Sequence, residues 1–582
     1  MKRLNKTIIW GLAGAMAFAN TSCESFDKVN TDPNTVTPEK VAAINLLSFV
    51  MLPSTLNVDQ WQRQQNLYAD TFAQYFSNDK YESNVCEPND KWNEEFWLQH
   101  WTWIANLNEV IRRCDGKEDM TNLKSIARIW KAWCFLRATD LFGDLPYFKA
   151  CDGSGIPAGY DAQKDIYYDL VKELTEASSE ISSNGGKVGI GDLIFQGDMA
   201  KWKAFANSLR LRIALRMTEV DPEKAKAEAE AAVAADGGLI TDNVVIWRAE
   251  NYYQNTINPH YFYAHYWESR LTMSVSMQRV LTNLGGVPVE MKSYYKSGQV
   301  PEYADPRALI MYNVTSTGTL ASRRYRGRWK GVEAGYTPAI AAEDDNAHKN
   351  NSRVGVFFVS LNPEPPENTP PVICKDRWAR LMYASEVYFL RAEGALRGWN
   401  MGGTAESFYE AGIRRSMAEY GNLIKSADIE AYLQSTMKNG YGTSVKFSDN
   451  TGDVTDDCNS KLAKIITQKY ISNFPDGGFE AWADYRRLGM PALDPFKMPT
   501  QNFVIEVGGH DYLGSCRRIT YPSYEQLHNE ANYKKCLEDF GPDVSTKRMW
   551  WDSKRTKVVK WEHYRPAQGE PGYEIGTLKD AK

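Results

Sequence analysis

The sequence predicts a mostly α-helical protein, with tetratricopeptide-like helix hairpins as a scaffold, a large irregular loop-rich insertion and minor β structure. In several separate segments, apolar residues recur at steps of three and four, which is the period of an amphipathic helix. These segments come in pairs of similar length, with Gly, Asn or Asp at their ends. Between the pairs lies a long stretch in which the helical period is lost and loop-forming residues are common.

The pair of helices over residues 202–235 carries the clearest signals. Apolar residues follow at steps of three and four from Trp202 to Ile213, as expected for the buried stripe of a helix. Asp221-Pro222-Glu223 then supplies a capping residue, a proline at the first helical position and an acid in the first turn. Alanines dominate until Asp236-Gly237-Gly238, which predicts the end of the second helix.

Two further pairs of segments repeat this pattern, namely residues 123–142 with 165–181 and residues 380–398 with 404–420. Residues 41–76 and 94–114 also have the helical period. Three to four hairpins of similar length are typical of tetratricopeptide-type repeats. Such repeats bury each hairpin against its neighbours and leave a curved surface.

A large insertion separates the hairpins. Residues from about 238 to 376 are poor in helical period and rich in Gly, Pro and Asn. Residues 244–336 include 15 aromatic residues among 93, which exceeds the chain average of 12%. Because binding residues gather on irregular segments that a rigid scaffold positions, we expect ligand contacts in this insertion.

The start of the chain predicts export and a lipid anchor. Lys2, Arg3 and Lys6 precede an apolar run over residues 8–19, which is typical of a secretory signal peptide. No later stretch offers the roughly 20 apolar residues that a membrane-spanning helix needs. Cys23 stands where the signal would be cleaved, and we interpret it as a bacterial lipoprotein acceptor whose acyl chains anchor the protein. A simple leader with an incidental cysteine is the alternative.

These observations predict a signal peptide over residues 1–22, a lipidated tether over 23–40 and a single domain over 41–582. Within that domain we expect helical repeats over about 41–237 and 377–490, with the insertion over about 238–376. Removal of the leader would change the net charge from -5 to -8, because the leader holds three cations and no anions. A mildly acidic chain without a basic stripe argues against a nucleic-acid partner.

The chain lacks the common catalytic and metal motifs. It contains no zinc-binding His-Glu-x-x-His, Gly-x-Ser-x-Gly elbow, Walker loop or Rossmann glycine pattern, so we expect no enzyme and no cofactor. A two-carboxylate glycosidase stays open, because 73 acidic residues cannot exclude one. The acidic loop over residues 449–457 could hold a structural calcium ion, although its spacing departs from the EF-hand register and a solvated loop is the alternative.

The nine cysteines show no zinc-site spacing. Export makes disulfides possible, but a core of this size does not need them. Disulfides and buried free thiols therefore both stay open.

Four stretches then show a family pattern. They are Trp202–Arg212, Met382–Glu393, Glu480–Arg487 with Pro491, and Arg517–Pro522 with Glu525 and Asn529. Together they resemble the SusD/RagB family of Bacteroidetes outer-membrane nutrient-binding lipoproteins. The likeness follows the family's order and covers the chain from about Asp27 to Trp551.

The resemblance implies a helical-repeat domain that is held in the outer membrane by its N-terminal lipid and exposed at the cell surface. It implies a lid on a SusC-like TonB-dependent transporter barrel and a glycan ligand captured for import, with a peptide ligand as the alternative. The arginine pairs Arg486-Arg487 and Arg517-Arg518 lie in the matching stretches. We expect them to be structural ion-pairing residues rather than ligand contacts.

Sugar recognition needs flat apolar rings together with planar polar side chains. The candidate ligand-binding rings are Tyr81, Trp92, Tyr263, Trp267, Tyr325 and Trp329. The first two lie in or directly after polar segments, and the other four lie in the insertion among Asn and Arg residues. For any one ring, packing in the core is the alternative, and we favour that alternative for Trp97, Trp101 and Trp103.

Overall fold

The computed structural model describes the chain from residue 42 to residue 552 with gaps. The described residues are 42–55, 58–77, 89–247, 271–291, 297–314, 329–332, 351–359, 378–494, 504–507, 510–513, 516–545 and 547–552. No helix among them is both long enough and apolar enough to cross a bilayer.

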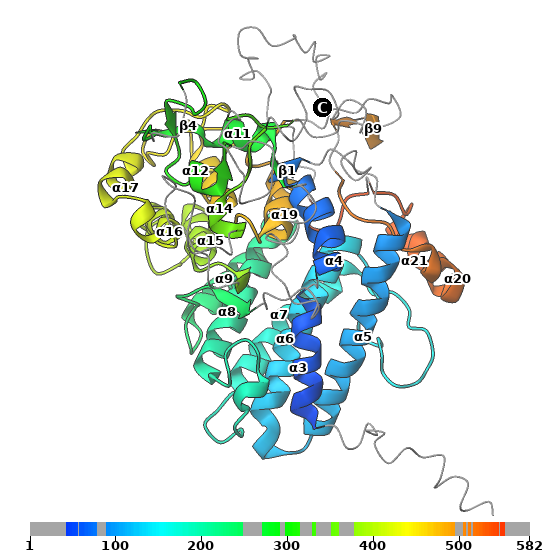
Figure 1. Cartoon of the computed structure of the whole chain (residues 1–582). Coiled ribbons are helices and arrows are strands. Elements are labelled where there is room, and N and C mark those ends of the chain that lie inside the picture. Colours follow the sequence, from blue (N-terminus) through cyan, green and yellow to red (C-terminus); the bar gives the residue numbers. More distant parts are fainter. Residues whose placement is uncertain are drawn as a thin grey trace, which may run out of the picture.

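Helices of the first half of the chain form a bundle (Figure 1). They are α3 (Ala43–Ser54), α4 (Val58–Gln60), η2 (Trp61–Asp70), α5 (Asp90–Cys114), η4 (Glu118–Met120), α6 (Thr121–Phe142), α7 (Gln163–Glu180), η5 (Gly189–Gly191), α8 (Met199–Arg216) and α9 (Pro222–Ala234). From α5 to α9, each long helix packs against the next. The predicted hairpins at 123–181 and 202–235 are therefore confirmed as α6 with α7 and α8 with α9.

The predicted start of α9 is confirmed in detail. The side chain of Asp221 accepts a hydrogen bond from the backbone N–H of Lys224 at 3.1 Å, and Pro222 occupies the first turn. A capping side chain satisfies one of the backbone donors that a helix start leaves unpaired. The same logic begins α16, where Thr404 and Ser407 form a reciprocal capping box.

The second group of helices follows the insertion. It comprises α15 (Ala384–Leu396), α16 (Ala405–Ala418), η9 (Gly421–Leu423), α17 (Ser426–Leu433), α18 (Lys461–Ser472) and α19 (Gly478–Leu488). The predicted hairpin at 380–420 is confirmed as α15 with α16, preceded by a short strand, and α18 packs against both helices. Helix α15 also packs against α8, which joins the two groups.

Short strands and helices make up the described part of the insertion. They are β2 (Val244–Trp247), β3 (Thr272–Met273), α11 (Val275–Leu281), β4 (Thr282–Pro288), β5 (Tyr303–Ala304), α12 (Ala308–Met311), β6 (Tyr312–Asn313), β7 (Arg353–Val354), α14 (Val356–Val359) and β8 (Trp378–Met382). Strands β2 and β8 pair antiparallel, with Val244 opposite Met382, so the insertion leaves and rejoins the scaffold at one point. Strand β1 (Phe76–Ser77) extends an antiparallel sheet in the order β1-β3-β7-β6.

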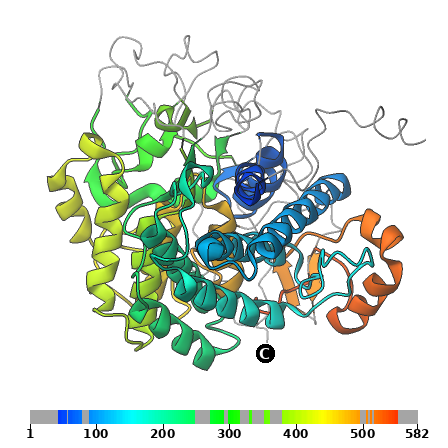
Figure 2. The same ribbon diagram turned by 90° about the horizontal axis from the view of Figure 1, so that it is seen from below.

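The chain ends with the antiparallel pair β9 (Val504–Val507) and β10 (His510–Leu513), followed by α20 (Ser523–His528) and α21 (Glu530–Phe540). Figure 2 shows α20 and α21 on the opposite side of the molecule from α16 and α17, with α5 to α8 between them. The predicted fold class, helical hairpins with minor β structure, is confirmed.

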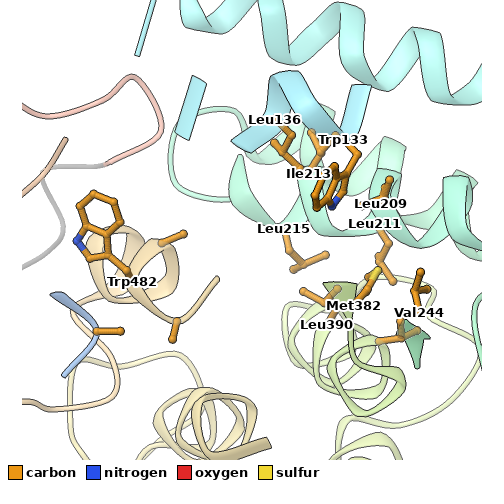
Figure 3. Close-up of a cluster of buried hydrophobic side chains, with 14 of the residues drawn as sticks. Trp133, Leu136, Leu209, Leu211, Ile213, Leu215, Val244, Met382, Leu390 and Trp482 are labelled. Carbon is orange, nitrogen blue, oxygen red and sulfur yellow. The ribbon is translucent and has the colours of Figure 1, made fainter. Parts of the chain in front are cut away.

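Helix α8 lies at the centre of the core. Figure 3 shows its Leu209, Leu211, Ile213 and Leu215 between Trp133 of α6 and Leu390 of α15. All six side chains are buried. Burial of each such side chain contributes about 1.5–3 kcal/mol, so α8 holds both groups of helices together.

Candidate ligand-binding site

The described part of the candidate site lies where the first turn of α5 packs against the π-helix η2. Asn89 caps α5, and its side-chain oxygen accepts from the N–H of Trp92 at 3.3 Å. From η2, Gln64 Nε2 donates to the carbonyl of Trp92 at 2.6 Å. The backbone of Trp92 is therefore fixed from both elements.

The ring of Trp92 is half-buried. It packs at a tilt on the ring of Tyr68, with centroids 5.8 Å apart and an interplanar angle of 52°. A supported ring that keeps part of its surface accessible has the geometry of a platform for an apolar ligand face.

Tyr68 positions this turn of α5 from a buried place in η2. Its hydroxyl accepts from the N–H of Asn89 at 2.6 Å and donates to Asn93 Oδ1 at 3.0 Å. Burial raises the pKa of Tyr68 well above its usual range, so the hydroxyl keeps its proton. Asn93 in turn donates to the carbonyl of Thr520 at 3.0 Å, which ties the turn to the segment before α20.

A polar pair shares the α5–η2 boundary with Trp92. Arg63 of η2 forms an ion pair with Glu95 of α5, and their side chains are 34% and 29% exposed. Glu95 follows Trp92 by three residues, so both lie on one face of α5. The Arg63–Glu95 pair was not predicted from the sequence. The spacing of Trp92 and Glu95 was visible in the sequence, but their approach to Arg63 depends on how η2 packs.

Trp329 is the one predicted ring of the insertion that the structure describes. It is 8% exposed, and its indole N–H donates to Thr282 Oγ1 at 2.9 Å. Its backbone N–H donates to the carbonyl of Gln299 at 2.7 Å. This is the environment of a packed ring beside α11, in a different part of the molecule from α5.

The other predicted residues, Cys23, Tyr81, Tyr263, Trp267 and Tyr325, lie outside the described residues. Their roles stay predictions, and so does that of Trp92.

Of the three tryptophans assigned to packing, two are buried and one is half-buried. Trp97 and Trp103 are 1% and 3% exposed, and Trp101 is half-buried. The Trp97 indole donates to Glu525 Oε2 at 3.1 Å, and its ring contacts that of Trp101 edge to face, with centroids 5.2 Å apart.

The stretches that carried the family resemblance form a buried ion-pair network around α8. Arg212 of α8 binds Glu386 of α15 with two hydrogen bonds of 2.8 Å. Arg487 of α19 binds Glu393 of α15 with hydrogen bonds of 2.6 and 2.9 Å. Burial alone would raise the pKa of Glu393, but Arg487 and Arg397 outweigh it and hold that pKa below its usual range.

Two further cations extend this network. Arg216 contacts Asp140 of α6 at 3.1 Å and Glu480 of α19 at 2.5 Å. Lys469 of α18 contacts Asp484 of α19 at 2.8 Å. The ion pairs therefore connect α6, α8, α15, α18 and α19. Their role is to hold these helices together, not to contact a ligand.

The four predicted structural arginines are all buried. Arg487, Arg517 and Arg518 form ion pairs, with Glu393, Asp552 and Asp543 as partners. Arg486 differs, because its guanidinium lies 3.5 Å from the centre of the Trp482 ring and donates at 2.8 Å to the carbonyls of Asp140 and Arg517. Burial lowers its pKa to about 9.

The acidic loop over residues 449–457 uses its carboxylates locally. Asp453 pairs with Lys461 at 2.8 Å, and Asp457 accepts from Thr451 Oγ1 at 2.6 Å. Among the described residues, no three His, Cys, Asp or Glu side chains gather as metal ligands. A structural calcium ion stays a prediction.

A lysine sits under this loop. The buried ammonium of Lys464 donates to the Ser444 carbonyl at 2.8 Å and to Asn459 Oδ1 at 2.7 Å. Burial lowers the pKa of Lys464 to about 7.

Five described cysteines are free thiols, and they are Cys114, Cys134, Cys151, Cys458 and Cys536. All but Cys151 are buried, and burial raises the pKa of Cys134 to about 12. The four buried cysteines match the alternative of buried free thiols.

Comparison with known proteins gives a consistent result. The SusD-like family, described as SusD and RagB outer membrane lipoprotein, matches residues 28–552. A SusD homologue from Parabacteroides distasonis is 30% identical with a TM-score of 0.78, and the match covers 88% of this chain and 98% of that one. A chitin-binding SusD homologue from Flavobacterium johnsoniae is 28% identical with a TM-score of 0.67 over the same shares. No curated protein matches the chain.

Proposed function

Because the chain belongs to the SusD-like family of outer membrane lipoproteins, we propose that it binds a glycan at the cell surface and passes it unchanged to a SusC-like TonB-dependent transporter barrel. The observation that carries this proposal is the supported, half-buried ring of Trp92 with a polar ion pair on the same boundary. The chitin-binding neighbour from Flavobacterium johnsoniae supports a glycan rather than a peptide as the ligand class.

The mechanism is capture without turnover. The C–H face of a sugar ring stacks on Trp92, and the planar groups of Arg63 and Glu95 exchange hydrogen bonds with neighbouring hydroxyls. Tyr68 and Gln64 hold the turn in place before the ligand arrives, so little ordering remains to be done on binding. Tyr81 and the insertion rings Tyr263, Trp267 and Tyr325 would add further platforms.

The proposed membrane anchor is a lipid on Cys23, directly after the predicted signal peptide. Acyl chains on Cys23 would hold the domain at the outer membrane beside the transporter. Mass spectrometry of the native protein tests this step, and an unmodified Cys23 thiol would contradict it. Co-purification of a large outer-membrane barrel with the native protein tests the transporter partnership.

Isothermal titration calorimetry of the protein with glycans, including chitin oligosaccharides, and with peptides tests the ligand. We expect Trp92→Ala to weaken glycan binding roughly tenfold, which is about 1.4 kcal/mol, because a stacking platform is lost. Trp399→Ala is the matched control, since Trp399 is also half-buried but lies in the loop between α15 and α16.

Three outcomes would overturn the proposal. One is equal glycan binding by the Trp92→Ala variant and the unsubstituted protein, which would remove Trp92 from the site. Another is tight peptide binding without binding to any glycan. The third is the release of reducing ends from a bound polysaccharide, which would indicate a glycosidase.

A further inference from the structure

Helix α3 is the first helix described after Cys23, and it carries no charge. None of its 12 residues is Asp, Glu, Lys or Arg. Its inner face packs against α5 and α6. Phe49 on its outer side is 60% exposed, and Ile44, Leu46 and Leu52 are half-buried. A surface helix normally places charged or polar residues on its solvent side.

The loop between α7 and α8 is fixed against this helix. Ser48 donates to the carbonyl of Gly191 at 2.5 Å, and the N–H of Leu193 donates to the sulfur of Met51 at 3.4 Å. A side chain at Gly191 would place its Cβ 2.3 Å from Ile44 Cγ1, so glycine is needed for this close approach.

A buried aspartate organises the same loop. Asp192 is 0% exposed, and it accepts from the backbone N–H groups of Ile194 and Gly197 at 2.9 Å each. It also accepts from the indole N–H of Trp202 in α8 at 2.6 Å. The loop is therefore built into the scaffold rather than loosely attached.

This fixed loop exposes apolar side chains. Ile190 at its tip is 88% exposed, the highest value among the large apolar side chains described, and Leu193 is 37% exposed. Single exposed apolar residues are common, but apolar residues that gather on one surface mark interaction sites. Because Gly191 and Leu193 contact α3, the loop adds its exposed side chains to those of that helix. We call Phe49, Ile190 and Leu193, with the half-buried Ile44 and Leu52, the α3 patch.

We propose that the α3 patch rests on the lipid surface of the membrane and orients the domain there. This inference rests on the proposed acylation of Cys23. The chain between Cys23 and α3 can span at most roughly 65 Å, and Phe49 lies only about 9 Å along the helix from its first residue. The lipid anchor therefore keeps this uncharged face within reach of the bilayer.

The small size of the patch favours lipid over a protein partner. A specific protein interface takes roughly 20–30 residues a side, whereas the α3 patch has five. Apolar side chains that enter the headgroup region add to the hold of a lipid anchor in proportion to the area they bury. The exposed Lys187 on the same loop suits the phosphates of that region.

The test uses the full lipidated chain in phosphatidylcholine vesicles. An environment-sensitive fluorophore is attached to Ile190→Cys, and in a separate variant to Leu527→Cys. Leu527 is 78% exposed on α20, at the right edge of Figure 1 and well apart from the lower end of α3, so it is the matched control. The background from other cysteines is measured on the unsubstituted chain.

We expect brominated lipids to quench the probe at position 190 by about twofold, with a shift of its emission to shorter wavelength, because apolar groups of the patch lie in the headgroup and acyl boundary. The probe at position 527 should show neither change. Equal water exposure of both probes on vesicle-bound protein would overturn this inference alone.

Other outcomes would also overturn it. Shielding of position 190 in detergent without any bilayer would mean that the chain's own N-terminal segment covers the patch. Shielding that appears only after a purified transporter is added would assign the patch to that partner. If the chain does not float with vesicles at all, both this inference and the anchoring step fail, while calorimetry with glycans still tests the ligand proposal separately.

Discussion

The buried charges around α8 and the buried carboxyl group of Asp70 in η2 are accommodated in different ways. Around α8, each carboxylate meets a cation, as Glu393 meets Arg487 and Glu386 meets Arg212. In η2, Asp70 is 0% exposed and no described cation pairs with it. Burial raises the pKa of Asp70 well above its usual range, and the nearby Asp476 raises it further.

Buried ionisable groups therefore have two different roles in this protein. Paired charges fix the register of helices that are far apart in the sequence, whereas burial favours the neutral form of Asp70, which lies against α19. The contact with α19 is close, because a Cβ on Gly478 would lie 1.9 Å from Asp70 Oδ1. A neutral carboxyl fits that contact, and an ionised one would carry a large cost.

The largest expected effect tests the paired region. Glu393→Ala leaves Arg487 buried without its bidentate partner, and we expect a loss of about 3–5 kcal/mol in the free energy of unfolding. Urea denaturation followed by circular dichroism measures it. A loss below about 1 kcal/mol would show that the remaining ion pair of Arg487, with Asp484 at 3.0 Å, is enough for this buried arginine.

The second prediction concerns Asp70. Its raised folded-state pKa means that its stabilising contribution is present below the unfolded-state pKa and is lost as pH rises through the folded-state value. Asp70→Asn keeps the shape and cannot ionise, so we expect the variant to gain melting temperature at pH 8 relative to the unsubstituted chain. The gain should shrink toward pH 4, and a constant difference at both pH values would contradict the assignment.

Much of the scaffold was predictable because its signals are local. The apolar stripe from Trp202 and the start at Pro222 predict α8 and α9, since periodicity and capping act within one or two turns. The pairing of Arg212 with Glu386 was not predictable, because 174 residues separate them. Both residues nevertheless lie within the four stretches that resemble the family. Part of the family pattern therefore consists of residues of the buried ion-pair network.

The candidate site was predictable only in part. The polar run before Trp92 indicated an accessible ring, and the ring is half-buried. The π-helical form of η2 and the Arg63–Glu95 pair depend on tertiary packing, which periodicity does not report. In the sequence, Trp329 lies among polar residues like the other predicted rings of the insertion. In the structure it is buried and donates hydrogen bonds to Thr282 and Gln299.

The third prediction concerns Lys464, a buried cation. Among the described residues, the acceptors of its ammonium group are the uncharged oxygens of Ser444 and Asn459 rather than a carboxylate. Its pKa is lowered from 10.5 to about 7, so the unfolded chain binds more protons between these values and stability should rise with pH from about 7 to about 10. Lys464→Met should remove that rise. Denaturation at pH 7 and pH 9.5 measures the difference, and an unchanged slope in the variant would show that another group causes it.

The smallest expected effect concerns an exposed ion pair, which serves as the reference for the buried ion pairs around α8. Arg414 and Glu430 form an ion pair at 2.7 Å with side chains 41% and 65% exposed, so water and salt screen their attraction. Glu430→Ala should change the free energy of unfolding by no more than about 1 kcal/mol. Glu430→Ala removes a carboxylate from the exposed Arg414, whereas Glu393→Ala removes one from the buried Arg487 and from Arg397. The difference between the two variants therefore measures the effect of burial together with that of the second arginine. Equal losses in the two variants would mean that burial does not amplify the network, and the contrast between the charges around α8 and Asp70 would then need another cause.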